Sequence, residues 1–327
     1  MFEKRIYLKS QQPKPSNKFD LIKLFLLIVI FIFTINTFAN LFIYSSITGG
    51  SLLVSPLATD IIQKTVSFIN SQENSKPIEE IVDKVLDGGK NNYGIVIRNL
   101  KTGERYYLNE DKVFDSASLY KLWIMAVVYE QLDQGEVQEN DVLSDSVEDL
   151  NEKFNISSSS AEFHDGTITT SVKNALENMI DISDNYSAMI LTQKVGLATV
   201  SQFLNDNDFN DSKIGTAIDN PKTSAKDIAS FFDKLYHDQL NDSSDSVQML
   251  DLLKKQQLNG KIPKYIPTQV EIAHKTGELD NVSHDAGIVY GPRSSYIIVV
   301  MSSTDNPSNA DENIAQISKL VYDYFEK

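Results

Sequence analysis

The stretch Asp115-Ser116-Ala117-Ser118-Leu119-Tyr120-Lys121-Leu122-Trp123 decides how this sequence is interpreted. It places a hydroxyl (Ser118) and an amine (Lys121) three residues apart, where the N-terminus of a helix would carry both on one face. A serine becomes a good nucleophile only when a neighbouring base takes its proton, and a lysine is such a base only when burial or a nearby cation lowers its pKa. The apolar run 124–128 predicts a buried helix that meets this condition. The free N–H groups at its start would also favour an oxyanion.

The same pair also fits a simpler alternative, a helix N-cap serine followed by a surface lysine. Two further motifs bear on this choice. Ser183-Asp184-Asn185 follows a predicted helical run, 172–182, and supplies a second hydroxyl and a side-chain amide. Lys275-Thr276-Gly277 lies near the start of a predicted C-terminal strand pair. Its lysine and hydroxyl could hold an anionic group, while the glycine permits close approach of the backbone.

The motifs S-x-x-K, S-D-N and K-T-G occur here in the order found in class A β-lactamases and penicillin-binding proteins. Over residues 76–327 the sequence resembles a class A β-lactamase-like serine hydrolase, and so does the segment 165–172 before S-D-N. The resemblance implies an α+β fold, an α/β sandwich whose antiparallel sheet is built from both termini of the domain, with an inserted all-helical lobe. The expected elements agree: strands at 93–98, 105–108, 286–290 and 296–301, a helical middle from 116 to 257, and a closing helix at 313–325.

The resemblance also implies a catalytic role for four residues. Ser118 would be the acylated nucleophile and Lys121 the acceptor of its proton. Ser183 would pass a proton to the leaving nitrogen, and Lys275 would favour ionisation of Ser183.

The same resemblance implies that the asparagine of S-D-N and the residues after the lysine of K-T-G bind the substrate. Asn185 would orient the side-chain amide of the substrate, and Thr276 would bind its carboxylate. The oxyanion hole would consist of the backbone N–H groups of Ser118 and of Glu278, the residue after Gly277.

The sequence departs from the family in two places. Class A β-lactamases deacylate with a glutamate on an Ω-shaped loop after S-D-N, but no glutamate lies between Glu177 and Glu271 here. The corresponding stretch, 211–221, looks shortened, and Asp219 is its nearest substitute. The family's arginine after K-T-G is also missing, and His284 or Asp285 could contribute there or be purely structural. Because general-base assistance is worth about 10²–10⁴-fold, we expect acylation with slow turnover.

The N-terminus predicts a membrane anchor. Residues 21–44 are almost continuously apolar, and such a helix spans a bilayer. The positive-inside rule makes 1–23 a basic cytoplasmic tail, 24–44 a transmembrane signal anchor, 45–75 an extracytoplasmic linker and 76–327 the hydrolase domain. These bounds predict a single-pass cell-membrane protein with an extracytoplasmic catalytic domain. Secretion after signal cleavage near Ala39 is the alternative. We favour the anchor because apolar residues resume at 41–43.

Composition narrows the possible partners. The chain has 327 residues and no cysteine, so disulfides and thiolate chemistry are excluded. Its four histidines lack paired metal-ligand spacing, so we expect neither a metal nor a cofactor. The net charge is −15, and residues 1–23 carry six basic and two acidic groups, which leaves about −19 on the remainder. A body this acidic disfavours nucleic acid as a partner. We expect a monomer.

Three functions follow as hypotheses. The first is a membrane-anchored hydrolase that opens β-lactam amides through an acyl-enzyme on Ser118. The second is a penicillin-binding-type D,D-peptidase acting on peptidoglycan stem peptides. The missing glutamate favours this second function, while the compact single domain and class A-like spacing favour the first. The third is a non-catalytic module that binds peptidoglycan or a partner, against which the intact Ser118, Lys121, Ser183 and Lys275 argue.

Overall fold

The structure is a computed structural model that describes residues 74–215 and 219–327. These residues all belong to one compact unit, Phe68–Lys327. The predicted tail 1–23, the predicted membrane span 24–44 and most of the predicted linker lie outside the described residues. Within the described part of the chain, no helix combines the length and the apolar character needed to cross a membrane.

The described residues alternate between helices and strands along the chain. Their order is α3 (Lys76–Leu86), η1 (Lys90–Asn92), β1 (Tyr93–Asn99), β2 (Arg105–Leu108), β3 (Val113–Asp115), η2 (Ala117–Tyr120), α4 (Lys121–Asp133), β4 (Val142–Ser146), α5 (Val147–Lys153), β5 (Thr167–Ser171), α6 (Val172–Asp181), α7 (Asn185–Val195), α8 (Leu197–Asp206), β6 (Lys222–Ser224), α9 (Ala225–Tyr236), α10 (Ser243–Leu253), β7 (Glu271–Leu279), β8 (Val282–Tyr290), β9 (Ser295–Ser303) and α11 (Pro307–Phe325).

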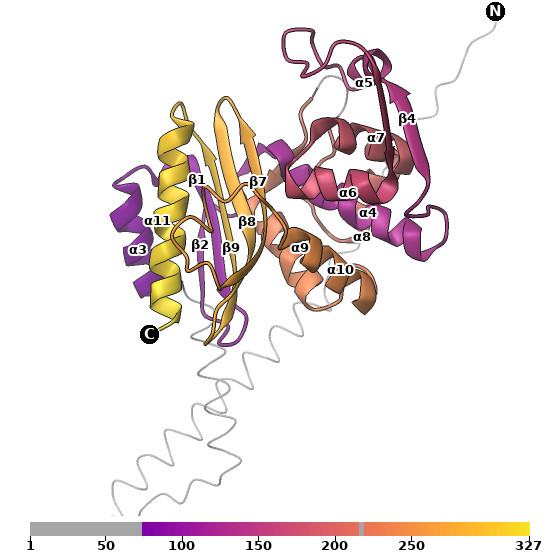
Figure 1. Cartoon of the computed structure of the whole chain (residues 1–327). Coiled ribbons are helices and arrows are strands. Elements are labelled where there is room, and N and C mark those ends of the chain that lie inside the picture. The colour runs from indigo at the N-terminus through magenta and orange to yellow at the C-terminus, as the bar shows by residue number, and fades with distance from the viewer. Residues whose placement is uncertain (1–73, 216–218) are drawn as a thin grey trace, which may run out of the picture. The chain divides into compact units, whose positions relative to one another are not determined.

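A five-stranded antiparallel sheet forms the centre of this unit, with strand order β2-β1-β9-β8-β7. Strands β1 and β2 come from the N-terminal side of the domain and β7 to β9 from its C-terminal side, so the expected sheet built from both ends is confirmed (Figure 1). The C-terminal part contributes three strands where two were expected. The additional strand, β7, lies at the sheet edge and contains the K-T-G motif.

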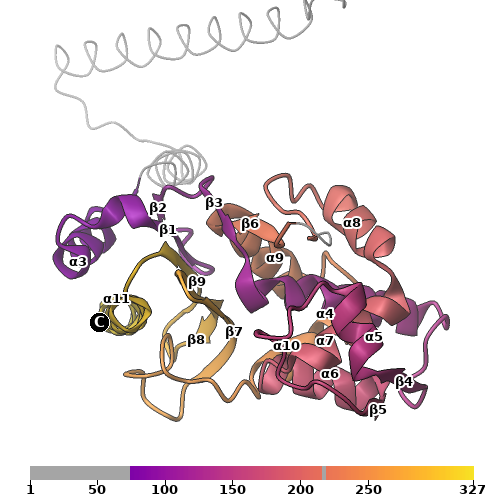
Figure 2. The same ribbon diagram turned by 90° about the horizontal axis from the view of Figure 1, so that it is seen from above.

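Both faces of the sheet are buried, because helices cover each of them. Side chains alternate across a strand, so neighbouring residues of β9 serve different cores. Val299 and Met301 belong to the core shared with the lobe that contains α4, α9 and α10. Ile298 and Val300 belong to the core beneath α3 and α11, which lie together on the other face (Figure 2).

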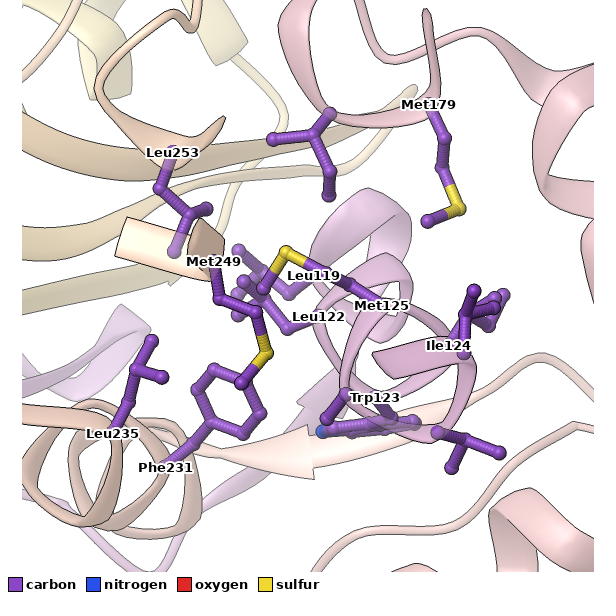
Figure 3. Close-up of a cluster of buried hydrophobic side chains, with 14 of the residues drawn as sticks. Leu119, Leu122, Trp123, Ile124, Met125, Met179, Phe231, Leu235, Met249 and Leu253 are labelled. Carbon is purple, nitrogen blue, oxygen red and sulfur yellow. The ribbon is translucent and has the colours of Figure 1, made fainter. Parts of the chain in front are cut away.

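Helix α4 runs through the hydrophobic core of the lobe. Every residue from Lys121 to Tyr129 is buried, which is typical of a helix that is apolar on all sides. Figure 3 shows Leu122, Trp123 and Met125 of this helix among side chains such as Met249 of α10. The same packing that stabilises the helix therefore removes Lys121, its first residue, from water.

Two expectations about the elements were wrong. The lobe is not all-helical, since it contains the two-stranded sheets β3-β6 and β4-β5. Strand β5 is a run of threonine, isoleucine and serine, in which the β-branched threonines and isoleucine favour an extended backbone. The closing helix begins at Pro307, not 313. Asn306 caps it, accepting the N–H of Asn309 at 3.2 Å, and proline suits the first helical turn.

Candidate active site

Ser118 and Lys121 lie where a short 3₁₀ turn passes into an α-helix. Ser118 is in η2 and partly exposed, whereas Lys121 begins α4 and has no exposed side-chain surface. The surface-lysine alternative is therefore wrong. The hydroxyl of Ser118 forms no hydrogen bond with another described residue, and in particular none with Lys121.

The Lys121 amine instead faces the S-D-N motif. Its Nζ donates to the carbonyl oxygen of Ser183 at 2.5 Å, to Oδ1 of Asn185 at 2.9 Å and to Oγ of Ser183 at 3.2 Å. Three acceptors match the three protons of an ammonium group. Burial lowers the pKa of Lys121 to about 8, although the negative charges of Asp184 and Glu162 act in the opposite direction. The amine is thus poised between its charged and neutral forms near neutral pH.

Ser183 reaches this position through an unusual backbone conformation. It joins α6 to α7 with a φ of 62°, in the left-handed region that costs a non-glycine residue about 1–2 kcal/mol. Asp184 then caps α7, accepting the N–H of Ser187 at 2.6 Å. The bend allows both the carbonyl and the hydroxyl of Ser183 to face Lys121.

Lys275 approaches the same hydroxyl from the sheet. Its Nζ donates to Oγ of Ser183 at 2.9 Å and to the carbonyl oxygen of Thr276 at 3.2 Å, and its side chain is fully buried. Burial, followed by the positive charge of Lys121, lowers the pKa of Lys275 to about 7. Oγ of Ser183 therefore lies between two amines of lowered pKa.

Gly277 is where strand β7 meets the turn that carries Ser118. A Cβ at this position would lie 3.0 Å from the carbonyl oxygen of Ser116 and 3.2 Å from Cβ of Ala117. Glycine thus permits a close approach that a side chain would obstruct. Strand β7 packs against this turn, and Glu278 follows Gly277 on the strand, so its backbone N–H is the candidate second donor of an oxyanion hole.

Neither proposed substitute for the missing arginine supplies a positive charge. His284 is fully buried, donates from Nε2 to the carbonyl oxygen of Asp115 at 2.8 Å and accepts the N–H of Ser302 at Nδ1. Burial lowers its pKa to about 4, so it is neutral at pH 7. The carboxylate of Asp285 is also buried and bonds Nδ1 of His274 at 2.9 Å. Both residues have structural roles here.

Sequence reasoning missed two charged residues at the site. The Lys261 side chain is only 2% exposed, and its Nζ lies 2.5 Å from Oε1 of Glu278. Its positive charge is a further cause of the lowered pKa of Lys275. Glu162, from the loop before β5, accepts the Nδ2 hydrogen of Asn185 at 2.7 Å. Neither residue belongs to a motif, so only the tertiary structure reveals these contacts.

A pocket of about 250 Å³ opens beside the S-D-N motif. Asn185 and Glu162 line it, as does Asp219, the nearest substitute for the missing glutamate. Its apolar part comes from Phe154 and Ile156 after α5, with Met189 of α7. In the residues that the structure describes, no group of three histidine or acidic side chains could hold a metal ion.

The fold and the grouping of a serine with two buried lysines are those of active-site-serine hydrolases. The model of the β-lactamase enzyme family matches residues 77–325, and the chain belongs to this family. It is 24% identical to β-lactamase VEB-1 of Pseudomonas aeruginosa over 291 residues, 80% of this chain and 94% of that protein.

Solved structures share the fold at a similar level of identity. PBP-A superimposes with a TM-score of 0.67 and 24% identity over 77% of this chain and 96% of its own. A mutant of PBP-A captured as an acyl-enzyme with penicillin G gives a TM-score of 0.67 and 24% identity, over 76% and 96%. These likenesses establish the fold, whereas the roles of individual residues depend on the geometry above.

Proposed function

We propose that this protein opens β-lactam amides through an acyl-enzyme on Ser118 and releases the product slowly. The observation that carries this proposal is the position of Oγ of Ser183, which accepts hydrogen bonds from both Lys121 and Lys275. Two buried amines of lowered pKa around one hydroxyl provide the means to move a proton, which a merely structural site would not need.

Acylation would use the groups described above, once the Ser118 hydroxyl turns toward the amine of Lys121. Oγ of Ser118 attacks the lactam carbonyl carbon, and its proton passes to the neutral amine of Lys121. The C–N bond then breaks, Ser183 protonates the leaving nitrogen, and Lys121 returns a proton to Ser183 across their 3.2 Å contact. The backbone N–H groups of Ser118 and Glu278 stabilise the oxyanion, a contribution of about 3–4 kcal/mol per donor in comparable sites.

Substrate binding would use the polar groups that flank this centre. Asn185 offers its side-chain amide to the substrate's acyl amide, and the hydroxyl of Thr276 binds its carboxylate. The charge of Lys275 and, further off, of Lys261 favours an anion at that end of the site.

Deacylation would lack the glutamate that activates water in class A β-lactamases. Asp219 lines the adjoining pocket, but its side chain is one methylene shorter than a glutamate. We therefore expect a long-lived acyl-enzyme. Asp219→Asn tests the substitute: a further slowing of product release, with acylation unchanged, would assign it the base, and no change would exclude it.

A D,D-peptidase acting on stem peptides is the second candidate. The absence of the glutamate favours it, as does the likeness to PBP-A, whose mutant retains penicillin G as an acyl-enzyme. A non-catalytic module is the third candidate, and the two lysine contacts to Ser183 argue against it.

One experiment separates these functions: the full-length protein, in detergent, is incubated with a reporter penicillin, and both labelling and product release are followed. Rapid release of product favours a β-lactamase. A lasting adduct on Ser118 favours either a slow β-lactamase or a peptidase, and hydrolysis of a D-Ala-D-Ala peptide would then identify the peptidase. Absence of labelling in folded protein leaves the non-catalytic module. Ser118→Ala should abolish labelling, and persistence of the label would show that Ser118 is not the nucleophile.

The cell-membrane location is part of the same proposal. The apolar span 24–44 and the basic residues before it support a single-pass anchor with an extracytoplasmic domain. Protease added to intact cells should degrade the domain and spare residues 1–23. Protection of the domain would contradict this topology, and a mature N-terminus near residue 40 would indicate signal cleavage instead.

A further inference from the structure

We propose that Glu162 makes the site selective for substrates whose acyl side chain carries an ammonium group close to the amide. This inference rests on the proposed acylation of Ser118 and deepens it by naming the class of side chain preferred. Glu162 belongs to none of the three motifs, and it contacts the one motif residue assigned to the substrate's amide.

Glu162 contacts the side-chain amide of Asn185 directly. Nδ2 of Asn185 donates to Oε1 of Glu162 at 2.7 Å, while Oδ1 of the same amide accepts from Lys121 at 2.9 Å. The amide is therefore held in one orientation, with its oxygen toward the buried lysine and its nitrogen toward the pocket. Glu162 occupies the donor that a substrate carbonyl would use.

Both negative and positive side chains line the pocket. Apart from Glu162, the charged residues of its lining are the carboxylate Asp219 and Lys153, whose Nζ is 2.7 Å from Asp145 and 3.1 Å from Gln193. That cation is therefore already engaged. In the described parts of the chain no lysine, arginine or histidine forms an ion pair with Glu162. The carboxylate thus presents a negative charge to the pocket, and the charge acts on Lys121 without forming an ion pair with it.

The size of the pocket limits what it can hold. Its volume of about 250 Å³ lies below the 300–1,000 Å³ typical of whole-ligand sites, so it suits one substituent of a larger substrate. Phe154, Ile156 and Met189 would contact an apolar group, and Glu162 lies beside the amide that fixes the substituent's point of attachment.

The position and charge of Glu162 predict an order of preference among substrates. A bound substrate carbonyl takes the Asn185 donor from Glu162, which leaves the carboxylate in need of a new partner. An ammonium group next to the substrate amide supplies it, a neutral group does not, and a carboxylate repels it. Because Glu162 is exposed and solvent screens the pairing, we expect differences of about 1.5- to fivefold between successive members of such a series.

Three penicillins that differ at one side-chain carbon test this order: ampicillin carries an ammonium group there, benzylpenicillin a hydrogen and carbenicillin a carboxylate. The second-order rate constant for acylation of Ser118 is measured for each with the full-length protein. We expect ampicillin to react fastest and carbenicillin slowest, with ratios that shrink as salt screens the charges. Glu162→Gln keeps the hydrogen-bond acceptor and should bring the ratios near one, and Glu162→Lys should reverse them.

The control is Glu136→Gln, the same chemical change at an exposed residue outside the pocket, which should preserve the wild-type ratios. Unchanged ratios in Glu162→Gln, or a wild-type series without preference, would overturn the selectivity proposal while leaving acylation intact. If none of the three penicillins labels the folded wild type, the proposed function itself fails, which is a distinct result.

Discussion

The Nζ of Lys275 donates a 2.9 Å hydrogen bond to Oγ of Ser183, although 92 residues separate the two in the chain. A serine hydroxyl has two lone pairs to accept with and one proton to donate. Lys275 and Lys121 both donate to this oxygen, so its proton is left to point at a third group. In an acylation reaction that group is the leaving nitrogen, which connects the contact to the proposed role of Ser183.

Removing the Ser183 hydroxyl should therefore slow acylation more than it disturbs the fold. For Ser183→Ala we expect the acylation rate constant to fall by about 10²–10³-fold, in the range of a lost proton-transfer group. Reporter-penicillin labelling measures this. A fall of less than threefold would contradict the proposed proton path.

Ser183→Gly separates chemistry from backbone strain. Glycine adopts a positive φ without the penalty that Ser183 and alanine incur at 62°. We expect the glycine variant to be as slow as the alanine variant but more stable to urea, by about 1 kcal/mol. Equal stability of the two variants would show that the left-handed conformation costs little here.

Gly277→Ala should impair the site by displacing the turn that carries Ser118. The new methyl group would lie 3.0–3.3 Å from atoms of Ser116, Ala117 and Leu119, closer than ordinary contacts. We expect destabilisation by about 1–3 kcal/mol and a loss of acylation of at least tenfold. Gly260→Ala is the matched control, because a Cβ there meets nothing within 4 Å. Equal effects of both substitutions would contradict this account.

Acylation should increase with pH, because Lys121 accepts a proton only when it is neutral. With its pKa lowered to about 8 and that of Lys275 to about 7, the rate constant should rise from pH 6 and level off above about pH 9. The two amines are close, so the midpoint belongs to the pair. A flat profile over this range would exclude Lys121 as the base.

The dependence of the acylation rate constant on pH, measured for Glu162→Gln, gives a second test. The charge of Glu162 raises the pKa of Lys121, so its neutralisation should move the midpoint to lower pH. A shift to higher pH would contradict the proposed electrostatic link between the pocket and the lysine.

Lys275→Met should stabilise the protein at pH 7 while it impairs acylation. The pKa of Lys275 is 10.5 in the unfolded chain and about 7 when folded, so the unfolded state binds more protons between these values. Its contribution to stability therefore rises as pH increases from about 7 to 10.5. We expect a gain of about 1 kcal/mol at pH 7 from removing the buried charge, and a smaller gain at pH 10.

Urea unfolding at both pH values measures these gains, with the exposed Lys76→Met as control. A loss of stability at pH 7, or a larger gain at pH 10 than at pH 7, would contradict the lowered pKa.

Much of this architecture was predictable because it follows from local patterns in the sequence. Strand β2 has the predicted bounds, 105–108, since its residues are bracketed by turns, and the order of the three motifs pointed to the family. The strands of the lobe were missed because β4 and β5 are short and polar, without a clear apolar alternation. Burial of Lys121 was foreseen from the apolar residues after it. Its hydrogen bonds to Ser183 were not, because they join residues 62 positions apart.

The sequence by itself determined which chemical groups are present: Ser118, two lysines and a second serine in motif order. It also showed that no glutamate lies between S-D-N and Glu271. Only the tertiary structure decided how these groups meet. Packing of α4 buries Lys121, the edge strand β7 delivers Lys275, and both converge on one oxygen. The physical reason is that pKa values and hydrogen bonds depend on burial and on distance in space, and neither is encoded in the spacing of residues along a chain.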